Sequence, residues 1–177
     1  PRTPLEDVGH HKLSILPGAP GEAQDTSPRI VLHARVTAPR LYLFNGHYSW
    51  VCQQAALNVE EGLAFMRSFP EPRLLIGDLN TPPESELMKR LAKEGWIDAW
   101  AALRPGEAGY TYESNAPDKR IDYVWISQDL RPYVKEVELV TERPNQHGAR
   151  LSDHIGLLAT FEWETNDTAI TARKESH

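Results

Sequence analysis

The sequence has little cysteine, no long hydrophobic run and no excess of positive charge. Its single cysteine, Cys52, cannot form an internal disulfide, which gives no evidence for an oxidising compartment and none against one. No apolar run approaches the roughly 18 residues of a membrane span, and the amino terminus lacks a charged-then-apolar signal pattern. The formal charge is -6, which disfavours a protein that coats nucleic acid by bulk electrostatics.

Length and composition indicate one globular domain. A chain of 177 residues with 40% hydrophobic content can bury a sizeable core. Because the chain begins at Pro1 and not at methionine, the missing signal pattern carries little weight for its location. We therefore expect no membrane span, favour the cytoplasm as the compartment, and leave the oligomeric state open.

Apolar periodicity predicts a mixed domain in which strands outnumber helices. Strands are expected at 29–36, 41–45, 73–77, 120–127, 133–141 and 155–163, with an extended segment at 110–113. Helices are expected at 51–68 and 84–94. Residues 1–28 show little periodicity, and residues 164–177 are expected to be a disordered tail. The pattern predicts an α+β layered domain over residues 1–163.

Polar residues follow the apolar strand expected at 73–77. Asp78 and Asn80 are two residues apart, so their side chains point to the same side of an extended backbone. Aspartate can orient or deprotonate an attacking water, and asparagine can donate to a phosphate oxygen. An ordinary strand-to-turn junction explains the pair equally well, because Asp, Asn and Pro are common in loops.

Asp153 and His154 stand side by side just before the last expected strand. Neighbouring side chains on extended backbone diverge, so the two cannot act on one atom in the same way. One division gives the carboxylate to a metal ion and the imidazole to a phosphate. In isolation, Ser152, Asp153 and His154 are better explained as a strand cap with a surface histidine.

Asp122 interrupts a run of apolar residues that is expected to form a buried strand. A buried carboxylate needs a partner. An imidazole partner would have its orientation fixed and its protonated form favoured. A salt bridge to Arg120 or another basic residue is the structural alternative, and this motif alone slightly favours it.

His47 lies where an expected strand ends and a helix follows. A single histidine is more often a polar surface group than a catalytic one. Five other histidines lie in no comparable setting and receive no role: His10, His11, His33, His147 and His177.

In chain order, these motifs resemble the endonuclease/exonuclease/phosphatase superfamily, which includes deoxyribonuclease I and abasic-site endonucleases. The resemblance covers approximately residues 27–163 and rests on the order and setting of these residues: His47, Asp78, Asn80, Asp122, Asp153 and His154. It implies a four-layered α/β/β/α sandwich of the deoxyribonuclease I-like type, with an active site at one end of two packed sheets.

The resemblance also implies roles on the substrate side of the site. Asp78 would orient and activate the attacking water. Asn80 would hold that water and the phosphate, and His47 would contact the phosphate.

Further implied roles concern charge and metal. Asp122 would pair with His154, and His154 would stabilise charge on the phosphoryl oxygens. Asp153 would help to bind Mg²⁺ or Mn²⁺, because hard cations prefer oxygen ligands. The metal would polarise the phosphate and neutralise the leaving oxygen.

The sequence departs from the family pattern at its start. The family places an asparagine-ended strand and a metal-binding glutamate upstream of these motifs, and residues 1–46 contain neither. We therefore expect a domain that lacks its first strands.

Two hypotheses follow: a metal-dependent phosphoesterase acting on a phosphodiester or phosphomonoester, or a non-catalytic or degenerate fragment of the same fold. The expected partner is a phosphoester, either nucleic acid or a small molecule, and net acidity favours the small molecule.

Overall fold

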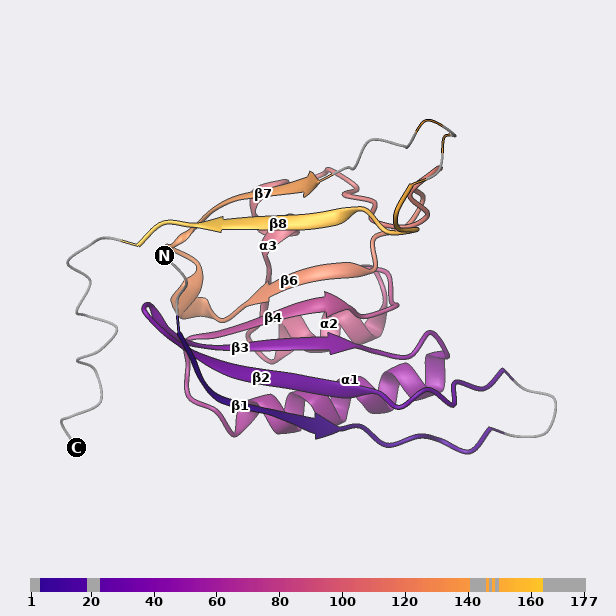
Figure 1. The fold of residues 1–177 in the computed structure, drawn as a ribbon, viewed down its shortest axis with the longest axis horizontal. Coiled ribbons are helices and arrows are strands. Elements are labelled where there is room, and N and C mark those ends of the chain that lie inside the picture. Colours follow the sequence, from indigo (N-terminus) through magenta and orange to yellow (C-terminus); the bar gives the residue numbers. More distant parts are fainter. Residues whose placement is uncertain (1–3, 19–22, 141–145, 147, 149, 164–177) are drawn as a thin grey trace.

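The computed structural model describes residues 4–18, 23–140, 146, 148 and 150–163 (Figure 1). Its strands are β1 (Leu5–Lys12), β2 (Ile30–Thr37), β3 (Arg40–His47), β4 (Arg73–Asp78), β5 (Ile97–Asp98), β6 (Asp122–Ile126), β7 (Val134–Val140) and β8 (Gly156–Phe161). Its helices are α1 (Cys52–Arg67), α2 (Glu86–Lys93) and α3 (Ala99–Leu103), with a 3-10 turn, η1, at Gln128–Leu130. These elements make a mixed α+β fold.

The described strands form two sheets. Six strands lie in the order β1-β2-β3-β4-β6-β5, and β7 pairs with β8 in a second sheet. Strands β3 and β4 are parallel and place His47 opposite Asp78, while the antiparallel pair β4 and β6 places Asp78 opposite Asp122. Three of the candidate residues therefore lie in a row across neighbouring strands.

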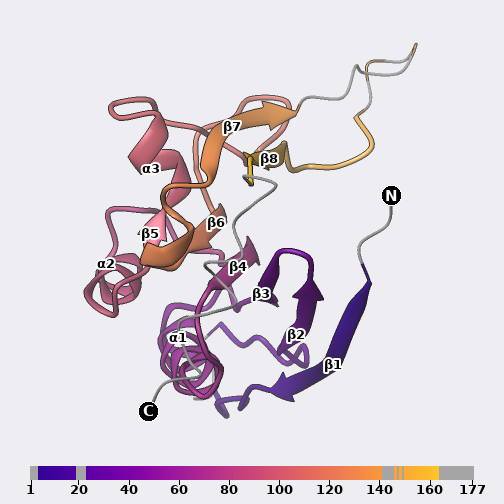
Figure 2. The same ribbon diagram turned by 90° about the vertical axis from the view of Figure 1, so that its left-hand side faces the viewer.

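The two faces of the six-stranded sheet have different coverings. Helices α1 and α2 lie on one side, and strands β7 and β8 lie on the other (Figure 2). Phe44 and Leu75 belong to the core on the helix side, whereas Val124 and Val137 belong to the core between the sheets. Strand β4 contributes to both cores, as expected for an apolar run buried on both faces. The described residues thus build three of the four expected layers.

Gly77 allows β3 and β4 to approach closely near the site. Gly77 has a φ of +138°, and a Cβ at this position would lie 1.9 Å from the backbone oxygen of Gly46. No side chain fits there, so glycine at position 77 is required for the register that aligns His47 with Asp78.

The structure confirms the expected strands and helices to within about two residues in the described part of the chain. The interpretation of residues 1–28 missed β1, because its side chains are mostly exposed at the sheet edge and show no apolar alternation. Strand β5 and helix α3 were also missed, since elements of 2 and 5 residues are too short to show a period. The segment expected at 110–113 forms isolated bridges through Tyr112 instead of a full strand.

The expected tail at residues 164–177 lies outside the described residues. No helix within the described part of the chain has the length and apolar character needed to cross a membrane. The compartment stays a prediction.

Candidate active site

The central contact of the site joins an acid to an imidazole. Nδ1 of His154 lies 2.8 Å from Oδ2 of Asp122. Because a carboxylate can only accept, this hydrogen bond places a proton on Nδ1. The alternative partner, Arg120, instead pairs with Asp98 at 2.7 Å. Of the two kinds of partner considered for Asp122, the structure therefore contains the imidazole.

Asp78 lies between two histidines. Its Oδ2 is 3.3 Å from Nε2 of His47 and 3.9 Å from Nε2 of His154. The side chain of His47 is 63% exposed, whereas that of Asp78 is only 14% exposed. The arrangement presents an accessible imidazole beside a mostly buried carboxylate.

Asn80 is held beside Asp78 by the turn that follows β4. Its backbone N–H donates to Oδ1 of Asp78 at 2.8 Å, and its side-chain Nδ2 donates to the carbonyl of Tyr48 at 2.9 Å. Its φ of +50° is a conformation that asparagine tolerates better than most residues. The amide nitrogen carries two hydrogens, so one remains for a phosphate or a water.

Burial and mutual charge shift the protonation of this cluster. Burial raises the pKa of Asp78 above its usual range, and the negative charge of Asp122 adds to the effect. For His154, burial opposes the charged form, but the hydrogen bond and charge of Asp122, with the charges of Asp78 and Asp153, raise its pKa overall. The site therefore favours a protonated imidazole next to carboxylates.

A metal ion could bind in the same cluster. Asp78, Asp122 and His154 each offer a ligand atom, and these atoms lie within 4.8 Å of one another. The two carboxylates suit Mg²⁺ or Mn²⁺, which prefer oxygen ligands, whereas a protonated His154 offers no lone pair to a metal. The donor set thus fits a divalent ion. Asp153 is exposed and does not belong to this group, so its role as a metal ligand stays a prediction.

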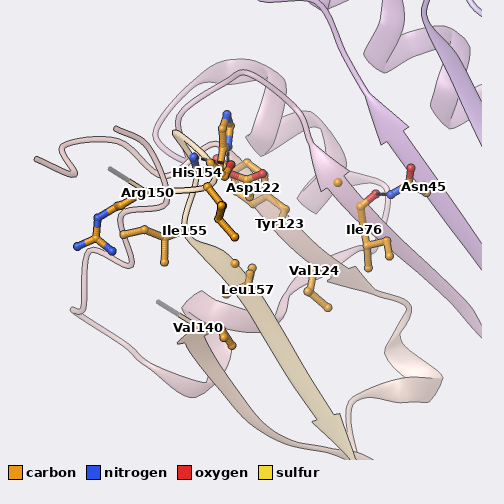
Figure 3. A pocket seen from close by; sticks show the side chains of 14 residues that line it. Asn45, Ile76, Asp122, Tyr123, Val124, Val140, Arg150, His154, Ile155 and Leu157 are labelled. Atoms are coloured by element: carbon orange, nitrogen blue, oxygen red, sulfur yellow. Dashed lines mark hydrogen bonds and ion pairs between the residues drawn. The ribbon is translucent and has the colours of Figure 1, made fainter. Parts of the chain in front are cut away.

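A pocket of about 490 Å³ lies next to the cluster and is lined by residues of both sheets. Figure 3 shows Asp122 and His154 at one side of the pocket and the apolar side chains of Val124 and Leu157 at the other. The acid–imidazole pair is therefore open to molecules that enter between the sheets.

Sequence reasoning did not predict that residues 111–114 support the pair. Oγ1 of Thr111 accepts from the backbone N–H of Asp122 at 3.3 Å, and the ring of Tyr112 lies 5.0 Å from the ring of His154. Ser114 also bonds to the chain just before His154. These contacts join residues that are 11, 38 and 42 positions apart, and no local pattern in the sequence marks them.

The fold and the site define a class: two-sheet α+β proteins with an acid–imidazole cluster at the strand ends of one sheet. Residues 10–154 match the model of the Endonuclease/Exonuclease/phosphatase family, so the chain belongs to this family. Members of this superfamily are hydrolases that act on phosphoester bonds. A search of curated proteins found no match to the chain.

Solved structures have the same fold at low sequence identity. A 3'-5' exonuclease from Neisseria meningitidis is 21% identical with a TM-score of 0.67, over 92% of this chain and 73% of the exonuclease. An AP endonuclease from Archaeoglobus fulgidus is 14% identical with a TM-score of 0.68, over 91% and 72%. A mannosyl-6-phosphatase from Bacteroides thetaiotaomicron is 19% identical with a TM-score of 0.66, over 90% and 67%. The expected deoxyribonuclease I-like fold is confirmed.

Proposed function

We propose that this chain hydrolyses a phosphodiester or a phosphomonoester by attack of an activated water, with a divalent metal ion as cofactor. The observation that carries the proposal is the 2.8 Å contact between Asp122 and His154, with Asp78 beside it. Ion pairs with a purely structural role also bring acids and histidines together. The Asp122–His154 pair, however, lines an open pocket, and the chain belongs to a family of phosphoester hydrolases.

In this proposal, Asp78 orients the attacking water and accepts its proton. A raised pKa makes a carboxylate a stronger base than an exposed one, which suits that role. Asn80 holds the water or a phosphate oxygen with its remaining amide hydrogen. His47, at 3.3 Å from Asp78, contacts the phosphate from the accessible side of the cluster.

His154 acts as a cation that stabilises charge on the phosphoryl oxygens. Its hydrogen bond to Asp122 fixes the ring and favours the protonated form, so Nε2 can donate to a developing oxyanion. Bound Mg²⁺ or Mn²⁺ would supply Lewis-acid polarisation of the phosphate. The carboxylates around His154, which are Asp78, Asp122 and Asp153, would hold that ion directly or through water.

The substrate can be a small phosphoester or nucleic acid. One similar structure is a 3' phosphatase from Neisseria bound to a product DNA hairpin, and another is a mannosyl-6-phosphatase. The formal charge of -6 favours a small phosphoester over long duplex DNA.

Hydrolysis of two chromogenic esters tests the proposal. We expect residues 1–177 to release p-nitrophenol from bis(p-nitrophenyl) phosphate or p-nitrophenyl phosphate with Mg²⁺ or Mn²⁺, and not with EDTA. His154→Ala should abolish turnover, while His10→Ala, which changes an exposed histidine on β1, should not. Turnover that survives in EDTA or in His154→Ala would contradict the proposal.

A non-catalytic domain is the second candidate. Among the described residues, the group that could hold a metal ion contains two aspartates and one histidine but no glutamate. If the site only binds, calorimetry will detect Mn²⁺ or phosphate binding to folded protein that shows no turnover of these esters or of natural phosphoesters.

A further inference from the structure

We propose that Ser114 is a positioning residue that fixes the segment carrying Asp153 and His154. Ser114 is 3% exposed. Its Oγ donates to the carbonyl of Ser152 at 2.7 Å, and its backbone N–H donates to the carbonyl of Asp153 at 2.7 Å. One buried residue therefore holds two consecutive peptide carbonyls directly before the imidazole. The catalytic consequence of this inference rests on the proposed function.

The segment before His154 depends on such bonds. Leu151 is 85% exposed, and the side chains of Ser152 and Asp153 are exposed as well. Exposed side chains bury little apolar area, so hydrophobic packing does little to fix them. The position of the backbone here is set by hydrogen bonds to the better-buried residues around 114.

Neighbouring contacts show that residues 111–114 support both members of the acid–imidazole pair. Oγ1 of Thr111 accepts from the N–H of Asp122 at 3.3 Å, on the side of the acid. Tyr112 forms an isolated bridge with His154, and the two rings lie 5.0 Å apart, on the side of the imidazole. Ser114 completes the support on the imidazole side. Its loss should therefore change the placement of His154 relative to Asp122.

The side-chain hydroxyl is the part of Ser114 that a substitution can isolate. Ser114→Ala removes the bond to Ser152 and keeps the backbone bond to Asp153, so the chain should still fold. A small displacement of a reacting group is costly, because efficient transfer requires the atoms to be held within tenths of an ångström. Ser114→Thr keeps a hydroxyl and should restore the bond.

Ser127 provides a matched control. It is 2% exposed, and its Oγ accepts from the N–H of Arg73 at 2.9 Å. It follows β6, whereas Asp122 begins that strand, so Ser127 lies at the end away from the site. Ser127→Ala should lower the unfolding temperature without a specific effect on His154.

The first readout is the NMR signal of the Nδ1 proton of His154, assigned by its absence in His154→Gln. We expect Ser114→Ala to shift or broaden this signal, while Ser114→Thr and Ser127→Ala retain it. The second readout is turnover with Mn²⁺. We expect Ser114→Ala to lower kcat by at least about fivefold with little change in KM, and Ser114→Thr to restore most of it.

Two results would overturn the inference. One is an unchanged Nδ1 signal in Ser114→Ala, whether or not the chain hydrolyses phosphoesters. The other is an equal fall of kcat in Ser114→Ala and Ser127→Ala at equal loss of unfolding temperature. A signal that changes only in Ser114→Ala, with no turnover even in the unsubstituted chain, would support the positioning role and count against the proposed function.

Discussion

At the scale of single residues, the site places the imidazoles of His47 and His154 beside carboxylates. Asp122 stabilises the charged form of His154, whereas burial and the charge of Asp122 disfavour the charged form of Asp78. The two groups suit different steps of phosphoester hydrolysis. A protonated imidazole can stabilise negative charge that develops on the phosphate, and a carboxylate with a raised pKa can accept a proton from the attacking water. Both pKa values are raised, so each shift makes the fold less stable as pH rises, and Asp122→Asn and Asp78→Asn test the two shifts separately.

Asp122→Asn should lower the pKa of His154. The substitution removes the hydrogen bond to a carboxylate and the negative charge that together raise that pKa. Because the folded-state pKa is raised, the stabilisation is full below the unfolded value of about 6.5 and is lost as pH rises through the folded pKa. Histidine NMR titration and urea unfolding across that window measure both effects.

A control at an exposed acid completes this test. Asp129→Asn, in the 3-10 turn η1, should leave the His154 titration unchanged. An unaltered His154 pKa in Asp122→Asn would show that the 2.8 Å contact does not determine the charge of the ring.

Asp78→Asn should stabilise the fold and abolish activity. The amide keeps an oxygen for the backbone N–H of Asn80 but carries no charge, so the unfavourable burial and the repulsion from Asp122 disappear. We expect a higher urea midpoint at pH 7 and a loss of turnover of about 100-fold or more. A lower midpoint would mean that the charged carboxylate is stabilising.

At the scale of the elements, the site depends on how closely neighbouring strands approach. The parallel pair β3 and β4 brings His47 opposite Asp78 only because Gly77 leaves room for the backbone of Gly46. Asp98 connects helix α3 to the segment just before β6. Its side chain accepts from the N–H of Trp100 at 3.0 Å and forms an ion pair with Arg120 at 2.7 Å. One substitution tests each feature: Gly77→Ala tests the close approach of the strands, and Asp98→Asn tests the buried ion pair.

Gly77→Ala should destabilise the fold by about 3 kcal/mol or more, because the new Cβ would lie 1.9 Å from a backbone oxygen that cannot move aside. Gly106→Ala is the control: this residue also has a positive φ, of +83°, but no atom lies within 4 Å of a Cβ added there. We expect it to cost only about 1 kcal/mol. Equal urea midpoints for the two variants would contradict the packing argument.

Asp98→Asn should lower the free energy of unfolding by about 3 kcal/mol, because it leaves the buried Arg120 without its charged partner. The two side chains are only 10% and 5% exposed. Lys89→Gln, which breaks an exposed pair with Glu86, should have no measurable effect. A small loss in Asp98→Asn, comparable to the control, would show that Arg120 finds water or another acceptor.

Elements long enough to show a buried face could be predicted from the sequence, whereas the exposed strand β1 and the short elements β5 and α3 could not. Helix α1 was predicted because apolar side chains recur at the period of a helix, and β4 because a short continuous apolar run is typical of a strand buried on both faces. Strand β1 pairs with β2 through its backbone while its side chains stay mostly exposed, so nothing in its residue types shows the pairing. Register and edge pairing are backbone properties and leave little trace in hydrophobicity.

At the scale of the whole molecule, the site exists only because two sheets meet. Asp122 comes from the six-stranded sheet, and His154 lies directly before β8 of the second sheet. The motifs gave the residue types in the correct order, but not the support from Thr111 and Ser114, which reach the site from a loop. The family resemblance implied the pairing of Asp122 with His154, but no motif marks the bonds from Thr111 and Ser114, because these join residues that only the fold brings together.

The most direct test of the account is the fate of oxygen during hydrolysis of bis(p-nitrophenyl) phosphate in ¹⁸O-labelled water with Mn²⁺. The account predicts ¹⁸O in the p-nitrophenyl phosphate and none in the p-nitrophenol, because water attacks phosphorus, and no product with EDTA or with His154→Ala. Label in the p-nitrophenol, product formed in EDTA, or no turnover by the folded chain would contradict it.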